Sequence, residues 1–600
     1  RGWYRSTYVG PDGAEHVIIY GRSDVDDRMR GGLGDDTIWG LLGNDRIEGD
    51  DGNDSILAGD GNDIVTDVFG DDKIIAGAGN DAIRSGPGED LVLSGSGNDF
   101  TMLTKDDLST NFSGVGNDVI LGGTGNDRIW GGNGDDWIEG GSGHDLLQGD
   151  NAINFQNDPT GGHDVIIGGP GSNDHDSDGG DDIIVAGPAV DRNEGMLGFD
   201  WVTYKGHDQP VVADMRFVGL MPADVAALRD RFDLVEGLSG WNGDDILRGL
   251  VGIDDVIEFG EGHVLTEEHL DRIAGLRALL QPPGHINYAC RFMVGGVCAV
   301  PVGDSDGISN LILGGGGSDL IEGRIGDDFI DGDAWLDVQL EWVAPGGANE
   351  TFDSALQFGD RVINGEINPA DLHIRRSIKL PEGDQTGVVD TAMYGHPGDQ
   401  YVFEYNGGGY WTVSHEGADE LEEADGRDVL RNIEALLFTD RCAMFPDDPA
   451  LGIYDLDDFD DCGSFGWIEI DDTDPPAPPL DRVEDTAMSA TAWIDPAEVV
   501  NPTDFIFEWQ FGEDGEEWEP SPNPSIDGTF NPTTREITSG WTPRDAEPGN
   551  HVRVIVSFLD DGGNRRSIVS DRTPDTVANI NDTPEGPEII PASPAVGDVL

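Results

Sequence analysis

Isolated apolar residues recur every nine positions in the first third of the chain, with polar residues and glycines between them. The series comprises Ile38, Ile47, Ile56, Val65, Ile74, Ile83 and Val92. Such a nine-residue unit divides into a three-residue strand, with one inward-facing apolar side chain, and a six-residue turn. β-Branched residues suit the strand, and glycine gives the turn backbone angles that other residues avoid. The pattern therefore predicts short strands joined by tight glycine-rich turns.

An aspartate stands two residues before each apolar position, and a glycine stands two residues before each aspartate. The triplet returns further along the chain and marks eighteen aspartates in all. They are Asp36, Asp45, Asp54, Asp63, Asp72, Asp81, Asp90, Asp99, Asp118, Asp127, Asp136, Asp145, Asp164, Asp182, Asp245, Asp254, Asp319 and Asp328. Two residues after them the chain has isoleucine or valine fifteen times and leucine twice. This regularity indicates a repeat architecture.

Two nine-residue units make an 18-residue coil with one short strand on each side. Stacked coils pair their strands in parallel at about 4.8 Å spacing, so the predicted fold class is mainly β, a parallel β-roll solenoid. Each coil buries only a thin aliphatic layer, and its turns crowd backbone carbonyls beside aspartates. A hard cation with oxygen ligands, such as calcium, resolves this crowding. Without the cation, the stacked acidic turns should repel one another and the roll should open.

Residues 31–39 and 122–130 resemble the RTX (repeats-in-toxin) nonapeptide, G-G-x-G-x-D-x-U-x. The resemblance implies that each of the eighteen aspartates is a calcium ligand and that carbonyls of the turn glycines complete the shell. It implies multiple Ca²⁺ ions, on the order of ten. Leu41 replaces a second glycine, and Asp67-Val68-Phe69 replaces an opening Gly-Gly-x. We expect the sites at these two departures to be weaker or empty.

Three longer gaps interrupt the nine-residue spacing. The spacing from Asp99 to Asp118 is one position longer than a full coil, and so is the spacing from Asp145 to Asp164. From Asp164 to Asp182 the spacing equals a full coil, with an asparagine at 173 midway. We expect the roll to continue through all three gaps with metal-free half-coils, bulged by one residue in the first two.

Histidines accompany some of the turns. His144, His163 and His175 lie in or beside predicted turns. Calcium prefers oxygen ligands, so we expect solvated turn residues here rather than metal ligands.

Two stretches outside the repeats have apolar residues at helical spacing. Residues 222–232 predict one short amphipathic helix, and residues 266–280 predict a second, whose apolar face is Leu270, Ile273, Leu276 and Leu280. We expect both faces to pack against the roll rather than to bind a partner.

Residues 336–440 read as mixed β structure, with strands expected at 391–394, 401–405 and 410–413. Residues 428–438 resemble the D-x-L-x-N-I-E-x-L-x-F segment that commonly ends RTX regions, which implies a cap over the open end of the solenoid. Residues 480–580 contain spaced strands and buried-type tryptophans, and they resemble bacterial immunoglobulin-like (Ig-like) sandwich modules.

The predicted organisation has ten segments. They are an N-terminal lead-in (1–30), the RTX calcium β-roll (31–185), an insertion with a short helix (186–240), RTX units (241–260), a helical, cysteine-containing insertion (261–304), RTX units (305–335), a β-rich cap (336–470), a proline-rich linker (471–480), an Ig-like sandwich (481–582) and the start of a further Ig-like repeat (583–600).

The net charge of the chain limits the kinds of partner that it is expected to bind. Asp and Glu number 119 against 34 Lys and Arg, for a formal net charge of -85. We therefore expect neither nucleic acid nor an anionic membrane surface as a partner. Hydrophobic residues are nevertheless 37% of the chain, which is too much for a disordered polymer and favours a fold whose acidic groups bind cations. No stretch approaches the roughly 18 apolar residues of a membrane span.

Four cysteines, at 290, 298, 442 and 462, allow two local disulfides, 290 with 298 and 442 with 462, or four free thiols. An even number fits an oxidising compartment, and we expect the chain to be secreted, extracellular or at the cell surface. The sequence begins at Arg1 and stops at Leu600 without a signal peptide or a natural end, so we expect a piece of a longer protein.

Inter-repeat stretches at 195–201, 235–241 and 332–336 resemble the C-terminal extension of large secreted bacterial proteins with an animal-type haem peroxidase domain upstream. The resemblance implies an enzymatic parent. Residues 1–600 themselves show no H-E-x-x-H motif, and we expect no catalytic residues and no haem in them.

Two functions stay open. One is a calcium-binding structural module that folds on export and stabilises or anchors its parent protein. The other is the non-catalytic tail of a secreted haem peroxidase. Calcium is the expected partner, with self-association or contacts to a matrix or cell surface as further candidates.

Overall fold

The computed structural model describes residues 4–445 and, beyond them, only the strands β40 to β50. Within 4–445 the description leaves out residues 11, 12, 14, 107, 151–160, 208, 217–229, 251–264, 266, 281–291, 295, 296, 301–309, 325, 382–387, 416–424 and 439–441. The chain forms two compact units. The first comprises Arg1–Thr386, Asp390–Met393 and Tyr401–Glu434, and the second comprises Gly387–Val389, Tyr394–Gln400 and Ala435–Leu600.

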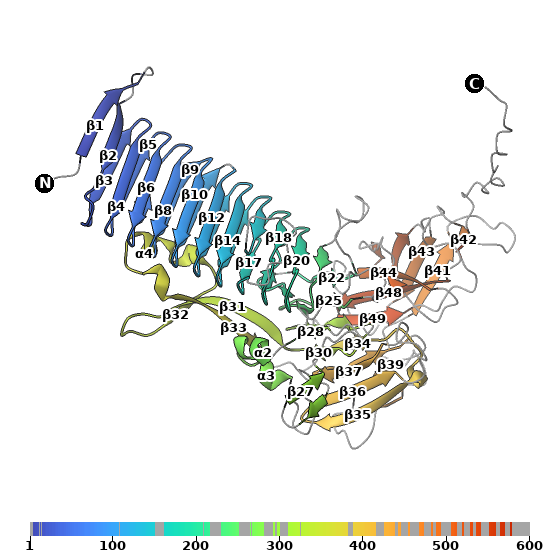
Figure 1. The fold of residues 1–600 in the computed structure, drawn as a ribbon. Coiled ribbons are helices and arrows are strands. Elements are labelled where there is room, and N and C mark those ends of the chain that lie inside the picture. The colour runs from blue at the N-terminus through green and yellow to red at the C-terminus, as the bar shows by residue number, and fades with distance from the viewer. Residues whose placement is uncertain are drawn as a thin grey trace, which may run out of the picture. The chain divides into compact units, whose positions relative to one another are not determined.

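A β-roll forms the body of the first unit, and its strands alternate between two sheets (Figure 1). The first sheet contains β1 (Tyr4–Val9), β2 (Glu15–Tyr20), β4 (Thr37–Leu42), β6 (Ser55–Asp60), β8 (Lys73–Ala78), β10 (Leu91–Ser96), β12 (Thr110–Val115), β14 (Arg128–Asn133), β16 (Leu146–Gln148), β18 (Asp174–Asp176), β20 (Arg192–Glu194) and β23 (Arg231–Asp233). All of its pairs are parallel except β1 with β2. The predicted mainly β fold with parallel sheets is confirmed.

The second sheet runs the whole length of the roll. It contains β3 (Arg28–Leu33), β5 (Arg46–Asp51), β7 (Ile64–Thr66), β9 (Ala82–Gly88), β11 (Phe100–Asp106), β13 (Val119–Thr124), β15 (Trp137–Ser142), β17 (Val165–Ile167), β19 (Ile183–Val185), β21 (Trp201–Thr203), β24 (Gly237–Ser239), β28 (Leu311–Leu313), β30 (Phe329–Asp331), β37 (Arg427–Arg431), β36 (Tyr410–His415) and β35 (Tyr401–Gly407). A third set of strands also pairs in parallel: β22 (Val212–Asp214), β25 (Ile246–Arg248), β29 (Leu320–Glu322) and β34 (Thr391–Met393).

The register follows the nine-residue repeat. Ile38 pairs with Ile56 and Ile47 pairs with Val65, in each case one full coil further on. All four are fully buried and belong to one continuous core cluster that fills the interior of the early roll. One apolar residue per half-coil thus suffices, because stacking joins the thin layers into a single core.

Two of the three predicted gap structures are confirmed. Phe100 pairs with Ala82, one regular coil earlier, whereas Thr110 pairs with Leu91, which is one position further back than a regular coil. The extra residue therefore lies between Phe100 and Thr110, and β12 continues the first sheet. In the third gap, Asn173 occupies the aspartate position of a half-coil that contains β18.

The prediction for the second gap is wrong. Leu146 pairs with Asp174, and Trp137 pairs with Val165, in both cases well beyond the length of a regular coil. Strand β16 in the first sheet is thus followed directly by β17 in the second, and no half-coil separates Asp145 from Asp164. The coil is lengthened by ten residues within one turn. Spacing alone does not distinguish a turn insertion from an additional half-coil.

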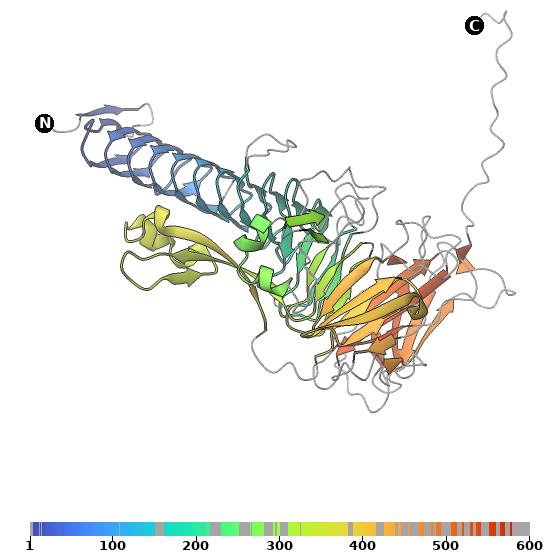
Figure 2. The same ribbon diagram turned by 60° about the horizontal axis from the view of Figure 1, so that its bottom comes forward.

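An arm of residues 335–379 lies along the outer face of the second sheet (Figure 2). It consists of β31 (Trp335–Trp342), β32 (Glu350–Phe352), the 3-10 helix η2 (Ala355–Gln357), α4 (Gly359–Ile363), the 3-10 helix η3 (Pro369–Asp371) and β33 (Leu372–Lys379). Leu340, Phe358 and Val362 of the arm share a buried cluster with Phe100 and Trp137 of the roll. The arm therefore gives the second sheet a second apolar layer outside the roll.

Polar contacts fix the arm on the roll. The carboxylate of Glu139 accepts hydrogen bonds from the Ser354 hydroxyl and the Ala355 N–H, both at 2.6 Å. Arg84 forms an ion pair with Asp360 of α4. Segments that are far apart in the sequence are thereby joined.

The helix expected at 266–280 is interrupted. It forms α2 (Glu267–Arg272) and α3 (Leu276–Leu279), separated at Gly275, whose φ of 96° ends the helical path. Leu270 and Leu276 pack in the same cluster as Trp201 of the roll, as expected for packing rather than partner binding. Residues 222–229 of the helix expected at 222–232 lie outside the described residues, and the prediction is wrong for Arg231 and Phe232, which belong to strand β23. None of the described helices is long and apolar enough to span a membrane.

The remaining strands of the first unit lie mostly in the segment that the sequence predicts to be a cap. Strands expected at 391–394, 401–405 and 410–413 are confirmed as β34, β35 and β36. Strand β37 lies parallel to β30, the preceding roll strand, and antiparallel to β36. The parallel stack thus changes to antiparallel pairing at residues 427–431. A separate hairpin consists of β26 (Phe292–Val294) and β27 (Val297–Val300).

The described strands of the second unit pair mostly antiparallel, and the unit also contains the 3-10 helix η4 (Gly398–Gln400). The strands are β38 (Ala435–Leu437), β39 (Cys442–Met444), β40 (Tyr454–Asp455), β41 (Trp467–Asp472), β42 (Arg482–Val483), β43 (Met488–Trp493), β44 (Ile506–Gly512), β45 (Glu519–Pro520), β46 (Thr529–Asn531), β47 (Glu536–Trp541), β48 (His551–Leu559), β49 (Arg565–Val569) and β50 (Val577–Ala578). Two four-stranded antiparallel sheets, in the orders β41-β43-β47-β46 and β45-β44-β48-β49, account for most of them, whereas β42 and β50 pair in parallel. The two expected disulfides fall outside the described side chains.

Candidate calcium-binding turns

The repeat aspartates form two ladders, one along each side of the roll. The Asp36 N–H donates to Asp54 Oδ1 at 2.7 Å, and the Asp54 N–H donates to Asp72 Oδ1 at the same distance. The opposite side repeats the arrangement, for example from Asp45 to Asp63 at 2.7 Å. Each aspartate thus uses one carboxylate oxygen to hold the turn of the preceding coil.

The second carboxylate oxygen of these aspartates is buried and has no hydrogen-bond partner among the described residues. The set comprises Oδ2 of Asp36, Asp45, Asp54, Asp63, Asp67, Asp72, Asp81, Asp90, Asp99, Asp118, Asp127, Asp136, Asp145, Asp164, Asp182, Asp200, Asp319 and Asp328. Buried carboxylate oxygens are normally paired, since an isolated buried charge is very costly. A row of such oxygens fits a row of bound cations.

In the repeats that begin with glycine, the first residue lets the free oxygen approach the backbone. A Cβ on Gly131 would lie 2.5 Å from Asp136 Oδ2 and 2.5 Å from the carbonyl oxygen of Gly149. A Cβ on Gly140 would lie 2.7 Å from Asp145 Oδ2. Carboxylate and carbonyl oxygens therefore converge where only glycine leaves room. This donor set, all oxygen, is the one that calcium prefers.

Burial changes the acidity of these groups. Removal from water raises the pKa of Asp63 and Asp127 to about 7, and that of Asp81 and Asp99 to about 8. Without a cation the folded roll therefore favours the protonated acids, because desolvation penalises the charged form. At neutral pH these turns need either protons or metal.

Most of the sequence-predicted ligands are brought together in the ladders. Asp245 differs, because Oδ1 accepts the Val211 N–H at 2.8 Å and Oδ2 accepts the Trp241 N–H at 3.2 Å. Asp254 lies outside the described residues. Asp319 and Asp328 form the same kind of bond between later coils: Asp319 Oδ1 accepts the Asp245 N–H and Asp328 Oδ1 accepts the Asn310 N–H, both at 2.7 Å.

Sequence reasoning missed several ladder residues. Asp182 donates its N–H to Asp200 Oδ1 at 2.8 Å, Asp319 donates to Asp390 at 2.8 Å, and Asp328 donates to Asp428 at 3.0 Å. Two of them carry the repeat triplet, since Asp200 and Asp428 each have a glycine two residues before and an aliphatic residue two residues after. That signal could have found them. Asp390 lacks the glycine, and only the fold identifies it.

The histidines take part in the turn hydrogen bonding. His163 Nδ1 accepts the Asp181 N–H at 2.7 Å, and His144 Nδ1 accepts the Ser172 N–H at 3.2 Å. For His175, the expectation of a solvated turn residue is wrong. It is fully buried in β18, where its Nδ1 lies 2.8 Å from Asn193 Oδ1, because it occupies the inward strand position after Asn173.

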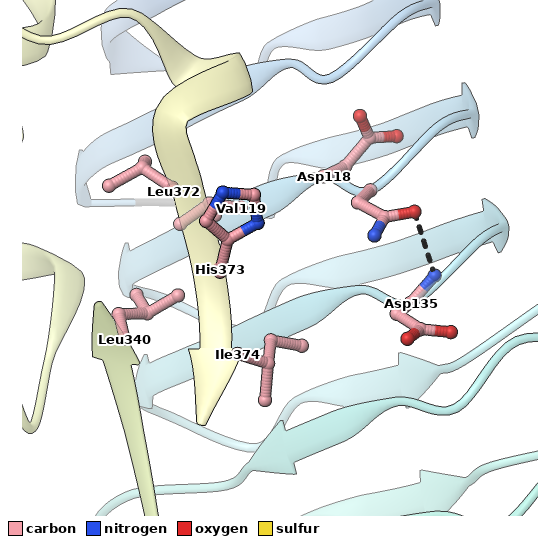
Figure 3. Close-up of a pocket in the computed structure, with 8 residues that line it drawn as sticks. Asp118, Val119, Asp135, Leu340, Leu372, His373 and Ile374 are labelled. Carbon is pink, nitrogen blue, oxygen red and sulfur yellow. Dashed lines mark hydrogen bonds between the residues drawn. The ribbon is translucent and has the colours of Figure 1, made fainter. Parts of the chain in front are cut away.

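A small pocket of about 110 Å³ lies where the arm crosses the turns of the roll (Figure 3). The arm contributes Leu340, Leu372, His373 and Ile374, and the roll contributes Asn117, Asp118, Val119 and Asp135. The Asp135 N–H already donates to Asn117 Oδ1 at 3.2 Å, and the Asp99 N–H donates to Asp118 Oδ1 at 2.7 Å. Asn117, Asp118 and Asp135 of the pocket thus serve the turns of the roll.

Residues 22–56, 30–65, 68–100, 112–147 and 305–334 match the model of the RTX calcium-binding nonapeptide repeat. The chain carries RTX calcium-binding nonapeptide repeats. The RTX ladder continues beyond the matched segments, for example through Asp182 and Asp200. A search of the curated proteins finds no relative that matches.

Proposed function

We propose that the first unit is a calcium-dependent structural module in which the ladder aspartates hold the ions. The buried row of Oδ2 atoms without hydrogen-bond partners in the described part of the roll is the observation that carries this proposal. The proposed ligands are the repeat aspartates predicted from the sequence, together with Asp200. Turn carbonyls such as that of Gly149 would supply the neutral oxygens.

The chain prepares these turns for a cation in two ways. Each Oδ1 is already committed to a neighbouring N–H, which fixes the orientation of the carboxylate. Each Oδ2 then lies within a stack of like charges, and two carboxylates about 5 Å apart repel by roughly 3 kcal/mol at an effective dielectric constant of about 20. Calcium neutralises this repulsion when bound, so folding and binding are coupled.

The wider role belongs to the same proposal. Calcium modules outside the cell bind with affinities of about 10⁻⁴–10⁻³ M, so the chain would stay expanded inside a cell and fold after export. It would then stabilise or anchor its parent protein at the cell surface or in a matrix. The ten-segment organisation remains our proposal, and the two four-stranded antiparallel sheets support the Ig-like module. The alternative role, as the non-catalytic tail of a haem peroxidase, is supported by the sequence resemblance.

Circular dichroism of the chain, first with chelator and then with millimolar calcium, tests the calcium-dependent module. We expect a large gain in β signal on calcium addition, and a smaller one with equal magnesium, which demands a stricter octahedral shell. Equal β content with chelator and with calcium would refute the proposal.

A further inference from the structure

The turn at residues 67–72 breaks the repeat in an informative way. Asp67 stands where the corresponding turns one and two coils earlier have Gly49 and Gly31. Sequence reasoning expects a weak or empty site here. The structure instead brings an additional carboxylate into the ladder.

Three carboxylates meet at this turn. One oxygen from each of Asp54, Asp67 and Asp72 lies within 4.8 Å of the others. The three residues are only 2%, 5% and 3% exposed. The regular repeat supplies Asp54 and Asp72, and the irregular residue Asp67 supplies the third group.

The hydrogen bonds of the cluster leave three oxygens free. Asp54 Oδ1 accepts the Asp36 N–H, Asp72 Oδ1 accepts the Asp54 N–H, and Asp67 Oδ1 accepts the Val68 N–H, each at 2.7 Å. Oδ2 of all three is buried and accepts no hydrogen bond from any other described residue, and only a proton shared between the Asp67 and Asp72 carboxyl groups could pair two of them. Each carboxylate is therefore held by one oxygen and offers the other.

Gly49 lets these oxygens approach its backbone closely. A Cβ at Gly49 would overlap with Oδ2 of both Asp67 and Asp54. The cluster thus gathers three hard, anionic oxygens against a backbone position that tolerates no side chain. Burying three like charges together is unfavourable unless a cation or a proton compensates them.

We propose that Asp54, Asp67 and Asp72 form a three-carboxylate calcium site that fills before the regular turns. This inference rests on the proposed calcium-dependent function. The added carboxylate increases the negative charge around the ion, and ligand charge is one of the factors that set calcium affinity. The irregular turn would then nucleate the roll as calcium rises.

Calcium binding by the full chain, measured by equilibrium dialysis in chelator-buffered calcium, tests the site. The Asp67→Asn variant keeps the shape and removes one charge, and Asp60→Asn makes the same charge change at an exposed position. We expect the first ion to bind about tenfold more weakly in Asp67→Asn, a loss of ~1.4 kcal/mol, and unchanged in Asp60→Asn. Hydrogen exchange at limiting calcium should protect residues 49–72 first in the wild type and not in Asp67→Asn.

A second variant keeps the test decisive if Asp67→Asn does not fold in millimolar calcium. Asp67→Gly restores the regular residue, and its first ion should bind as weakly as in the neighbouring turns. Equal or tighter first-ion binding in either folded Asp67 variant would overturn the proposal and indicate a shared proton or an obstructed site. Absence of calcium binding by the wild type would instead refute the proposed function itself.

Discussion

The turns of the early roll fall into two groups that differ at the first position of the repeat. Flanking turns have glycine there, at 31, 40, 49, 122, 131, 140 and 149. Most central turns have a small, fully buried side chain: Ala58, Ala76, Ser85, Ser94 or Ser113. Both groups keep the aspartate ladder, with N–H to Oδ1 distances of 2.7 Å from Asp63 to Asp81 and from Asp118 to Asp136.

The turn aspartate thus has two separable roles, one for each oxygen of its carboxylate. The ladder bond needs only Oδ1 and persists whichever residue stands at the first position. Space beside Oδ2 needs glycine, because a Cβ there would come within 2.7 Å of the oxygen at Gly131 and Gly140. We therefore expect the flanking turns to bind calcium more tightly than the central turns with alanine or serine.

The central turns have other sources of stability. Ser94 Oγ lies 2.9 Å from Thr101 Oγ1 inside the roll, and Ser113 Oγ donates to Asn111 Oδ1 at 2.9 Å. The arm also contributes, since Phe358 packs 6.1 Å from Phe100, centroid to centroid. Packing and internal hydrogen bonds thus support coils in which less room remains for a cation.

The largest effect should follow from removal of a flanking aspartate. Asp136→Ala deletes the acceptor of the Asp118 N–H as well as a free Oδ2, and an unsatisfied buried N–H alone costs about 1–3 kcal/mol. Asp127→Ala should behave alike. We expect weaker calcium binding and a lower calcium-dependent melting temperature, measured by calorimetry at fixed calcium.

Asp106→Ala is the matched control for these variants. Asp106 lacks both the glycine two residues before and the isoleucine two residues after, so the change should stay within about 0.5 kcal/mol. Greater damage from Asp106→Ala than from Asp136→Ala would show that the assigned register is wrong.

The next largest effect should follow from an exchange of glycine and alanine at the first position of the repeat. Gly131→Ala introduces a Cβ 2.5 Å from Asp136 Oδ2, and we expect at least one calcium site to weaken about tenfold, or ~1.4 kcal/mol. Ala76→Gly should cost about 0.5–1 kcal/mol in metal-free stability while it strengthens calcium binding. Calorimetric titration with calcium measures the affinity of each variant, and thermal unfolding with chelator measures the metal-free stability. If the two substitutions changed calcium affinity in the same direction, the residue at the first repeat position would not set the affinity.

Acid should partly replace calcium. Burial raises the pKa of Asp36 and Asp90 to about 6 and that of Asp81 and Asp99 to about 8. Groups with a raised folded-state pKa stabilise the metal-free roll fully below the unfolded pKa near 3.8, and this contribution disappears as pH rises through about 6 to 8. Chelated protein should therefore gain β signal by circular dichroism between pH 8 and pH 5.

The calcium-loaded protein provides the opposite trend as a control. Protons compete with the cation for the same carboxylates, so calcium affinity should fall over the same pH range. A chelated chain with identical spectra at pH 8 and pH 5 would contradict the burial argument.

The smallest effect concerns the second glycine position. Leu41 has a φ of 85°, a left-handed conformation that costs a non-glycine residue roughly 1–2 kcal/mol, and its side chain is 40% exposed. Leu41→Gly should therefore stabilise the roll by up to about 1 kcal/mol, seen as a higher melting temperature in calcium. Leu42→Gly, at an exposed neighbour without positive φ, should not stabilise; a gain there equal to that at Leu41 would rule out backbone strain as the cause.

The nine-residue repeat alone predicts the roll and most of its candidate ligands. Each ladder bond joins residues one coil apart, and each coil buries the same inward position, as with Ile38 and Ile56. Because every interaction of this kind recurs at a fixed spacing, the nine-residue pattern contains the strands, the register and the aspartates. The same reasoning predicted the bulge before Thr110 and the role of Asn173.

Other features depend on contacts between residues with no fixed spacing in the sequence, and they become visible only in the folded chain. The direct step from Asp145 to Asp164, the ladder contact from Asp319 to Asp390 and the docking of Ser354 on Glu139 join segments that no repeat relates. In the sequence, Asp67 is only a replacement of the glycine that begins a regular repeat. Its carboxylate gains meaning from Asp54 and Asp72, which stacking of the coils brings within 4.8 Å. The nine-residue period specifies which residues become neighbours one coil apart. The positions of the insertions and the arm depend instead on contacts with the surface of the folded roll.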